Sequence, residues 1–291
     1  MPTASSFKQL LSAYQERIEE ALKQHMPNLG RTQTEGGTVL REACEYALLN
    51  GGKRFRPALV YMVADGLNLR ADVTAAALSV EYFHTASLIA DDLPCMDNDD
   101  ERRNQPSVHK VYGEATALLA SYALIAAGYG LIAEAAKAAK GDKERVGMEA
   151  LANAARNTGV FGATGGQFLD INPPDLKLET LREILYKKTV SLFEISFVFG
   201  WLFGGGNVAA LEVVRQCAAH FGMAFQIADD IGDVEQDAKN GRKINMAGVF
   251  GVEEARRMFH QEIKGYQRTL KELNLESPEL LSLADFLEAR V

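Results

Sequence analysis

The segment from Asp91 to Arg103 reads DDLPCMDNDDERR and carries a high density of negative charge. Six carboxylates fall within its first eleven residues, and two arginines follow them directly. Like charges this close repel each other, so the crowding favours a fold only when a cation lies among them. Carboxylate oxygens are the preferred ligands of hard cations such as Mg²⁺, which often bridge to phosphate groups. The segment therefore predicts a divalent metal site that binds a phosphorylated ligand.

A second acidic segment, FQIADDIGDVEQD, runs from Phe225 to Asp237 and repeats the form of the first. In both, an apolar stretch leads to an alanine and then to Asp-Asp. Asp229 and Asp233 are one helical turn apart and point the same way. Because the C-terminal end of a helix carries partial negative charge, two helices that each end in aspartates indicate a strong cation between them. One acidic helix end alone is as often a solvated turn, so the interpretation depends on the pair.

Proline explains the spacing in the first acidic segment. Asp91 and Asp97 are six positions apart, so on a continuous helix they would point about 120° away from each other. Pro94 is expected to end the regular helix, and a loop can then bring Asp97 back toward Asp91.

Basic residues cluster in three further places, each of which could bind an anion. The stretch GGKRFRP begins a predicted helix, where free backbone N–H groups also favour negative charge. A second group follows the first acidic segment, and a third lies in YKKTVSLFE. The residues are Lys53, Arg54, Arg56, Arg102, Arg103, Lys187 and Lys188. An acidic centre surrounded by cations suits two phosphate-bearing ligands, one held by metal and one held directly by arginine and lysine.

The composition limits the class of protein. The chain has 291 residues, 47% of them hydrophobic, a formal net charge of −8 and a pI of about 5.3, which argues against a nucleic-acid partner. Three widely spaced cysteines indicate a reducing, cytoplasmic location and no disulfide framework. No uninterrupted apolar stretch is long enough to predict a membrane span. Residues 117–140 come nearest, but their small side chains suit a buried helix.

Apolar residues recur at three- and four-residue steps along most of the chain, which predicts an all-α fold. No alternating pattern predicts a strand, and no linker divides the chain, so residues 1–291 are expected to form a single domain. The predicted helices span 7–25, 38–50, 55–67, 74–90, 114–140, 144–158, 178–203, 208–233, 253–273 and 278–289.

Five motifs in order resemble the short-chain trans-polyprenyl diphosphate synthases, from about Tyr46 to the C-terminal helices. They are GGKRFRP, DDLPCMDNDDERR, GGQFLDI, KKT and FQIADDIGD. Each is common by chance, but the ordered set is specific. The resemblance implies a helical bundle of the isoprenoid synthase type with a central active-site cavity, and a homodimer.

The resemblance also implies a mechanism of head-to-tail condensation. Three Mg²⁺ ions, for which Mn²⁺ could substitute, would hold the diphosphate of an allylic substrate and assist its ionisation. Isopentenyl diphosphate would bind separately and attack the allylic cation. The implied metal ligands are Asp91, Asp97 and Asp229, supported by Asp92 and Asp233. Arg102 and Lys188 would contact the allylic diphosphate; Gln167, Thr189, Phe225 and Gln226 would line the cation site. Isopentenyl diphosphate would bind Lys53, Arg56, His84 and Arg103.

The sequence departs from the family pattern in three places. Asn104 stands where glycine is usual after the paired arginines, and asparagine tolerates left-handed backbone angles. The loop after the second acidic segment is short, so that Lys243 takes the role of one lysine and Lys239 is only a candidate for the other. Tyr122 occupies a position where a small polar pair is usual.

Product length is left open by these motifs. The growing prenyl tail should pass Ser87 and Ala86, about one turn before Asp91, and their small size favours geranylgeranyl diphosphate over farnesyl diphosphate. Tyr122 or Phe83 could instead form a floor that stops growth earlier. Two other functions remain open: a class I terpene cyclase, and a non-catalytic regulatory subunit of a prenyltransferase.

Overall fold

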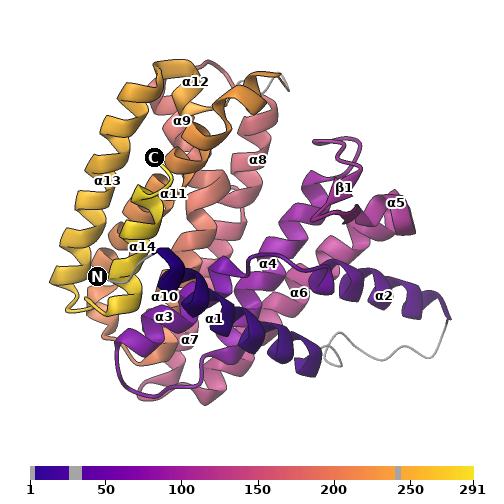
Figure 1. Cartoon of the computed structure of the whole chain (residues 1–291). Coiled ribbons are helices and arrows are strands. Elements are labelled where there is room, and N and C mark those ends of the chain that lie inside the picture. Colours follow the sequence, from indigo (N-terminus) through magenta and orange to yellow (C-terminus); the bar gives the residue numbers. More distant parts are fainter. Residues whose placement is uncertain (1–3, 26–34, 240–243) are drawn as a thin grey trace.

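The computed structural model describes residues 4–25, 35–239 and 244–291 (Figure 1). Almost all of these residues lie in helices, as predicted. The longer ones are α1 (Ala4–His25), α2 (Glu35–Leu49), α3 (Phe55–Gly66), α4 (Thr74–Asp91), α6 (Glu114–Ala138), α7 (Lys143–Thr158), α8 (Ala163–Ile171), α9 (Leu178–Leu185), α10 (Ser191–Gly204), α11 (Leu211–Lys239), α13 (Val252–Glu272) and α14 (Pro278–Glu288). Short helices are α5 (Val108–Tyr112), α12 (Met246–Phe250), the π-helical η2 (Tyr186–Val190) and the 3-10 helix η3 (Val208–Ala210).

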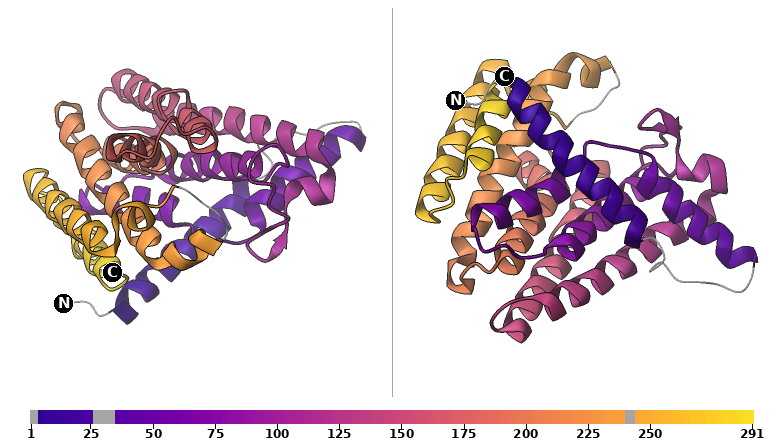
Figure 2. Two further views of the ribbon diagram at one scale, coloured as in Figure 1. Left: turned by 90° about the horizontal axis from the view of Figure 1, so that it is seen from above. Right: turned by 60° about the horizontal axis from the view of Figure 1, so that its bottom comes forward.

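The helix α10 forms the centre of the bundle. Every one of its residues is buried, and it packs against α3, α4, α7 and α11. Around it, α4 packs on α6 and α11 packs on α13. In the views of Figures 1 and 2, α13 and α14 lie on one side of the molecule and α2 lies on the other. The buried apolar side chains of the described residues form one continuous core.

A two-stranded hairpin corrects the expectation that the chain has no strand. β1 (Glu101–Arg102) pairs antiparallel with β2 (Gln105–Pro106). The two loop residues, Arg103 and Asn104, both have positive φ, 58° and 62°, as the tight turn of a two-residue hairpin requires. Strands this short carry no alternating pattern. The expectation that Asn104 accepts a left-handed conformation is confirmed.

Two predicted helix ranges differ from the structure, and the helix α8 was not predicted. The range 178–203 is divided by the π-helical turn η2, because one extra residue is accommodated between α9 and α10. The sequence analysis missed α8, since its two adjacent glycines have poor helix propensity. The helix α11 runs six residues past Asp233, to Lys239. Asp229 and Asp233 therefore lie within a helix, and the argument from the helix C-terminus holds only for the first acidic segment.

Candidate active site

The first acidic segment begins where α4 ends, as the proline predicted. Asp91 is the last residue of α4, and the chain turns through Pro94 so that the Asp97 backbone N–H donates to the Asp91 carbonyl oxygen at 2.9 Å. Burial raises the pKa of the Asp91 carboxyl to about 7; Lys188 acts against that rise and Asp97 adds to it. The turn therefore brings two carboxylates together beside a lysine.

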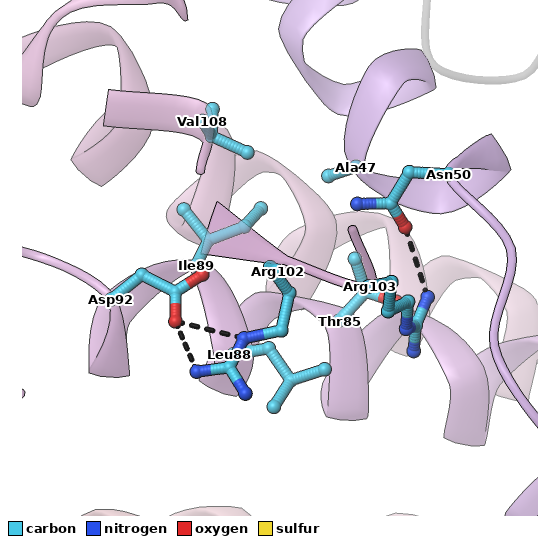
Figure 3. Close-up of a pocket in the computed structure, with 9 residues that line it drawn as sticks. All are labelled: Ala47, Asn50, Thr85, Leu88, Ile89, Asp92, Arg102, Arg103 and Val108. Atoms are coloured by element: carbon cyan, nitrogen blue, oxygen red, sulfur yellow. Dashed lines mark hydrogen bonds and ion pairs between the residues drawn. The ribbon is translucent and has the colours of Figure 1, made fainter. Parts of the chain in front are cut away.

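Arg102 holds the other side of this segment. Its guanidinium donates to both Asp92 and Asp99, and Asp92 is buried, whereas Asp91 is partly exposed. Figure 3 shows Asp92 and Arg102 beside Arg103 at a small cavity of about 10 Å³. A cavity of this size has room for about one water molecule and not for a substrate. Asp92 thus anchors Arg102, and Asp91 and Asp97 remain the more accessible carboxylates.

In the second acidic segment, the structure gives each carboxylate a different environment. Asp229 is partly exposed and ion-paired with Arg290, which follows α14. Burial raises the pKa of Asp229, an effect that Arg290 opposes and Asp233 strengthens. Asp230 is buried and accepts hydrogen bonds from the Gln226 amide at 2.8 Å and the Met246 backbone N–H at 2.8 Å. Asp230 therefore ties α11 to α12, and Asp229 is directed to the site.

The basic motif GGKRFRP divides into two roles. Arg54 is buried, is ion-paired with Glu19 and Glu81, and donates to the Leu48 carbonyl oxygen. Its guanidinium is fully engaged, so the expectation that it contributes to an anion site is wrong. Lys53 is exposed and close enough to Asp229 to lower that residue's pKa.

A cluster of cations forms where α3 meets α4 and the hairpin. Arg56 Nη1 lies 3.4 Å from His84 Nε2. Burial lowers the pKa of His84 well below its usual value, and the positive charges of Arg56 and Arg103 lower it further. Arg56 Nε and His84 Nδ1 are buried and find no hydrogen-bond partner among the described residues. Buried donors without partners are costly and are typical of a ligand site. Three of the four residues predicted to bind isopentenyl diphosphate therefore lie together. Lys53 and Arg56 both interact electrostatically with Asp229, which places Lys53 near this cluster.

Glycine makes room for the arginine of this cluster. Gly52 has φ of +120°, and a Cβ there would lie 2.6 Å from Arg103 Cζ. Arg103 also donates to the Asn50 side chain at 3.1 Å and to the Gly51 carbonyl oxygen. The glycine pair of the first motif thus fixes an arginine of the second.

The π-helical turn η2 carries Lys188 and Thr189. Lys188 is ion-paired with Asp170 of α8, and Thr189 Oγ1 donates to Gln226 Oε1 at 2.9 Å. Gln167 of α8 is partly exposed, yet both polar atoms of its amide are buried and unpaired within the described chain. Thr189 of η2 and Gln226 of α11 are therefore joined directly, and Asp170 ties Lys188 to α8 next to the unpaired Gln167 amide.

Aromatic rings form the apolar wall next to Gln226. The ring centroid of Phe225 lies 5.0 Å from that of Phe193 and 5.5 Å from that of Phe55. Arg56 lies over the Phe193 ring at 4.6 Å, and Arg290 lies over Phe225 at 5.6 Å. Electron-rich ring faces can also stabilise a transient carbocation.

The donor set fits a magnesium ion that is completed by a ligand. Within the described residues, no three carboxylate, imidazole or thiol side chains converge closely enough to hold a metal by themselves. Mg²⁺ is usually held by one or two carboxylates together with substrate phosphates and water. Asp91 with Asp97, and Asp229 with Asp233, are pairs of that kind.

The proposed chain-length residues lie in different surroundings. Ser87 is partly exposed and, four residues before Asp91, lies on the same side of α4. Ala86 is fully buried, and its carbonyl oxygen accepts a hydrogen bond from Ser121 of α6 at 2.9 Å. Tyr122 is 59% exposed on the outer face of α6, so it forms no floor within its own subunit.

Four residues of the site were missed by the sequence analysis. Arg290 and Glu81 are far in sequence from the motifs they contact. Asp170 and Gly166 lie inside GGQFLDI, whose regular spacing could have indicated a helix next to KKT. Lys243 lies outside the described residues, and Lys239 is exposed at the end of α11.

This fold and this arrangement of acids and cations define a helical enzyme that handles diphosphates. The model of the polyprenyl synthetase family matches residues 37–247. The chain is 36% identical over 274 residues to a chloroplastic geranylgeranyl pyrophosphate synthase of Capsicum annuum, covering 87% of this chain and 72% of that one. It is 33% identical over 303 residues to a farnesyl diphosphate synthase of Geobacillus stearothermophilus, covering 98% of each.

Solved structures agree with these relatives. An FPP/GFPP synthase from Zymomonas mobilis superposes with a TM-score of 0.84 at 29% identity, covering 98% of this chain and 99% of that one. A geranyltranstransferase from Thermotoga maritima gives 0.77 at 26% identity, covering 96% and 97%. The chain therefore belongs to the polyprenyl synthetase family and is a trans-prenyltransferase of the all-α isoprenoid synthase fold. Enzymes of this family use Mg²⁺.

Proposed function

We propose that this protein condenses isopentenyl diphosphate with an allylic diphosphate, head to tail, and releases inorganic diphosphate. The observation that carries the proposal is the presence of two separate cation groups beside the acids. Lys188 and Arg102 lie near Asp91, whereas Arg56, His84 and Arg103 form a second cluster near Asp229. A terpene cyclase needs only one diphosphate site, so the second cluster favours a synthase with two substrates.

Each group of residues has a separate task in the central active site that we propose lies between the acidic segments of α4 and α11. Lys188 and Arg102 hold the allylic diphosphate, and Asp91, Asp97, Asp229 and Asp233 supply the carboxylates around it. Mg²⁺ bound to those carboxylates, three ions by likeness to the family, would neutralise charge as the diphosphate leaves. Asp92 contributes by holding Arg102.

The second cluster positions the other substrate. Arg56, Arg103 and Lys53 bind its diphosphate as charged donors, and neutral His84 adds one N–H donor. Phe225 and the dipoles of Gln167, Thr189 and Gln226 line the allylic cation. The released diphosphate, held by Lys188, is positioned to take the final proton. In this proposal, residues 1–291 form a single domain.

We infer that the protein is a homodimer through α6. By length and composition alone this helix could cross a membrane, and 39% of its most apolar window is buried within the chain. Its exposed face carries Leu118, Leu119 and Tyr122, and an apolar groove of about 730 Å³ runs beside it to α7. In the proposed dimer, which we place in the cytoplasm, a second copy of the chain covers this apolar stripe.

We also propose geranylgeranyl diphosphate as the final product. Ser87 is small and partly exposed on the Asp91 side of α4, so it leaves the start of the tail path open, whereas Ala86 is buried next to α6 and bears on the deeper part of the path. Growth that stopped at farnesyl diphosphate would require a floor built elsewhere.

Incubation of the purified protein with Mg²⁺, isopentenyl diphosphate and each allylic diphosphate in turn tests the function. A synthase consumes both substrates, and Mn²⁺ should replace Mg²⁺. Cyclic hydrocarbon from an allylic diphosphate alone would show a cyclase. A protein that binds neither substrate nor turns them over would be a regulatory subunit.

A further inference from the structure

The π-helical turn η2 places Lys188 and Thr189. The Ser191 backbone N–H donates to the Tyr186 carbonyl oxygen and closes the turn, and contacts with neighbouring helices add to this bond. Residues two apart on a helical turn point to roughly opposite sides of its axis. Tyr186 therefore points away from the side that Lys188 faces. Its hydroxyl donates to Glu194 Oε2 of α10 at 2.6 Å.

Glu194 is a carboxylate buried in the middle of the bundle, with 2% of its surface exposed. Its Oε1 accepts from Asn153 Nδ2 at 2.8 Å and from Asn157 Nδ2 at 2.9 Å, both on α7. Arg215 lies 3.9 Å away and is itself partly exposed. Burying a charge is costly unless it is fully hydrogen-bonded, so three aligned donors on one carboxylate mark a rigid junction.

The opposite side of η2 is held by backbone packing. A Cβ on Gly166 of α8 would lie 2.3 Å from the Lys188 backbone nitrogen, so α8 and η2 are in direct contact. Ser191 Oγ donates to the Lys187 carbonyl oxygen at 2.6 Å. The turn is thus clamped between α8 in front and the carboxylate of α10 behind.

We propose that Glu194, with Asn153, Asn157 and Tyr186, is a positioning network for the allylic diphosphate site. It contacts no substrate. It fixes the backbone of η2, and through it the ammonium of Lys188 and the hydroxyl of Thr189. The hydrogen bonds of the network reach α7 and η2 and none reaches the cluster of Arg56, His84 and Arg103, so the network acts on the allylic site and not on the other.

The inference rests on the proposed function, and substitution of Tyr186 tests it. Tyr186→Phe removes one hydroxyl and keeps the ring. We expect kcat/KM for geranyl diphosphate to fall about tenfold, because small displacements of a binding group are costly in catalysis, with KM for isopentenyl diphosphate unchanged. Glu194→Gln should give the same pattern, and the double variant should be no worse than the more impaired single variant.

Tyr61→Phe is the matched control, since it removes a buried hydroxyl that donates to Thr74 at 3.1 Å, between α3 and α4 and outside the Glu194 network. It should change neither constant. Equal effects on both substrates, or a lower Tm with unchanged kinetics, would reduce the network to ordinary core stability and overturn the proposal. Calorimetry of geranyl diphosphate binding to the wild-type protein with Mg²⁺ separates the two failures. If the wild-type protein neither binds nor turns over the substrate, the proposed function is refuted. If the wild-type protein binds normally and the variants have unchanged kinetic constants, only the positioning role is refuted.

Discussion

The guanidinium of Arg290 is ion-paired with the carboxylate of Asp229, although the two residues are 61 positions apart. The same guanidinium lies over the rings of Phe225 and Phe286, at 5.6 and 5.8 Å. Arg290 therefore offsets the negative charge of a carboxylate that is otherwise penalised by burial. A metal ion that binds Asp229 must compete with this arginine.

Arg290→Gln should therefore bind Mg²⁺ more tightly in the presence of inorganic diphosphate. A pair of this exposure contributes at most about 1 kcal/mol, so the gain in affinity should be about threefold to fivefold by calorimetry. Arg257→Gln, which breaks a surface pair with Glu254, serves as control and should change nothing. A weaker metal affinity in Arg290→Gln would instead indicate that the arginine binds the diphosphate.

Asp91→Asn should abolish most turnover and stabilise the metal-free protein. The pKa of Asp91 is raised to about 7, above its unfolded value of about 3.9, so the stability linked to its proton is lost as pH rises through 7. The gain in Tm in EDTA should therefore be about 2 °C or more at pH 8 and smaller at pH 5. A gain that is equal at both pH values would contradict this origin, and full wild-type activity in excess chelator would refute the metal requirement.

Gly52→Ala should weaken isopentenyl diphosphate binding selectively. The added methyl group would lie 2.6 Å from Arg103 Cζ, at a φ of +120° that alanine adopts poorly. We expect KM for isopentenyl diphosphate to rise about tenfold with KM for the allylic substrate nearly constant, as loss of one charged contact implies. Gly251→Ala, at an exposed glycine that also has positive φ (+87°) but open space around it, is the control. A similar rise in KM for both substrates would show that the substitution disturbs the fold.

Ser87→Phe should shorten the main product from geranylgeranyl to farnesyl diphosphate with little change in Tm, because Ser87 is partly exposed on the Asp91 side of α4. Ala86→Tyr tests the deeper position, where the ring must enter either the tail path or the contact between α4 and α6. A lower Tm with unchanged product length would show that Ala86 is ordinary helix packing. Wild-type protein that stops at farnesyl diphosphate under saturating isopentenyl diphosphate would refute the proposed product.

Leu119→Glu should convert the proposed dimer to a monomer, because it places charge in the exposed apolar stripe of α6. Light scattering at micromolar concentration measures the change. Leu69→Glu, at a comparably exposed leucine outside α6, should leave the assembly intact. A wild-type monomer would contradict the dimer outright.

Periodicity was sufficient for the long helices because each has a continuous apolar face. It failed at α8 and at η2, where glycine and an extra residue depend on the packing of one segment against another. The proximity of Asp91 and Asp97 followed from their spacing and one proline. The contacts of Arg290 and Glu194 could not be predicted, because their partners are distant in sequence and only the tertiary fold brings them together. Arg54 shows the converse: its type suggested a ligand contact, whereas three nearby acceptors engage it.

The exposed stripe of α6 also bears on how the enzyme should be handled at the bench. A subunit that shields such a surface only by pairing has a stability tied to its own concentration. Turnover assays run at nanomolar enzyme would then sample separated subunits, and specific activity would fall on dilution and recover on concentration. Rate constants for this protein should accordingly be measured across a dilution series, since a single dilute stock would record the dissociation equilibrium together with the chemistry.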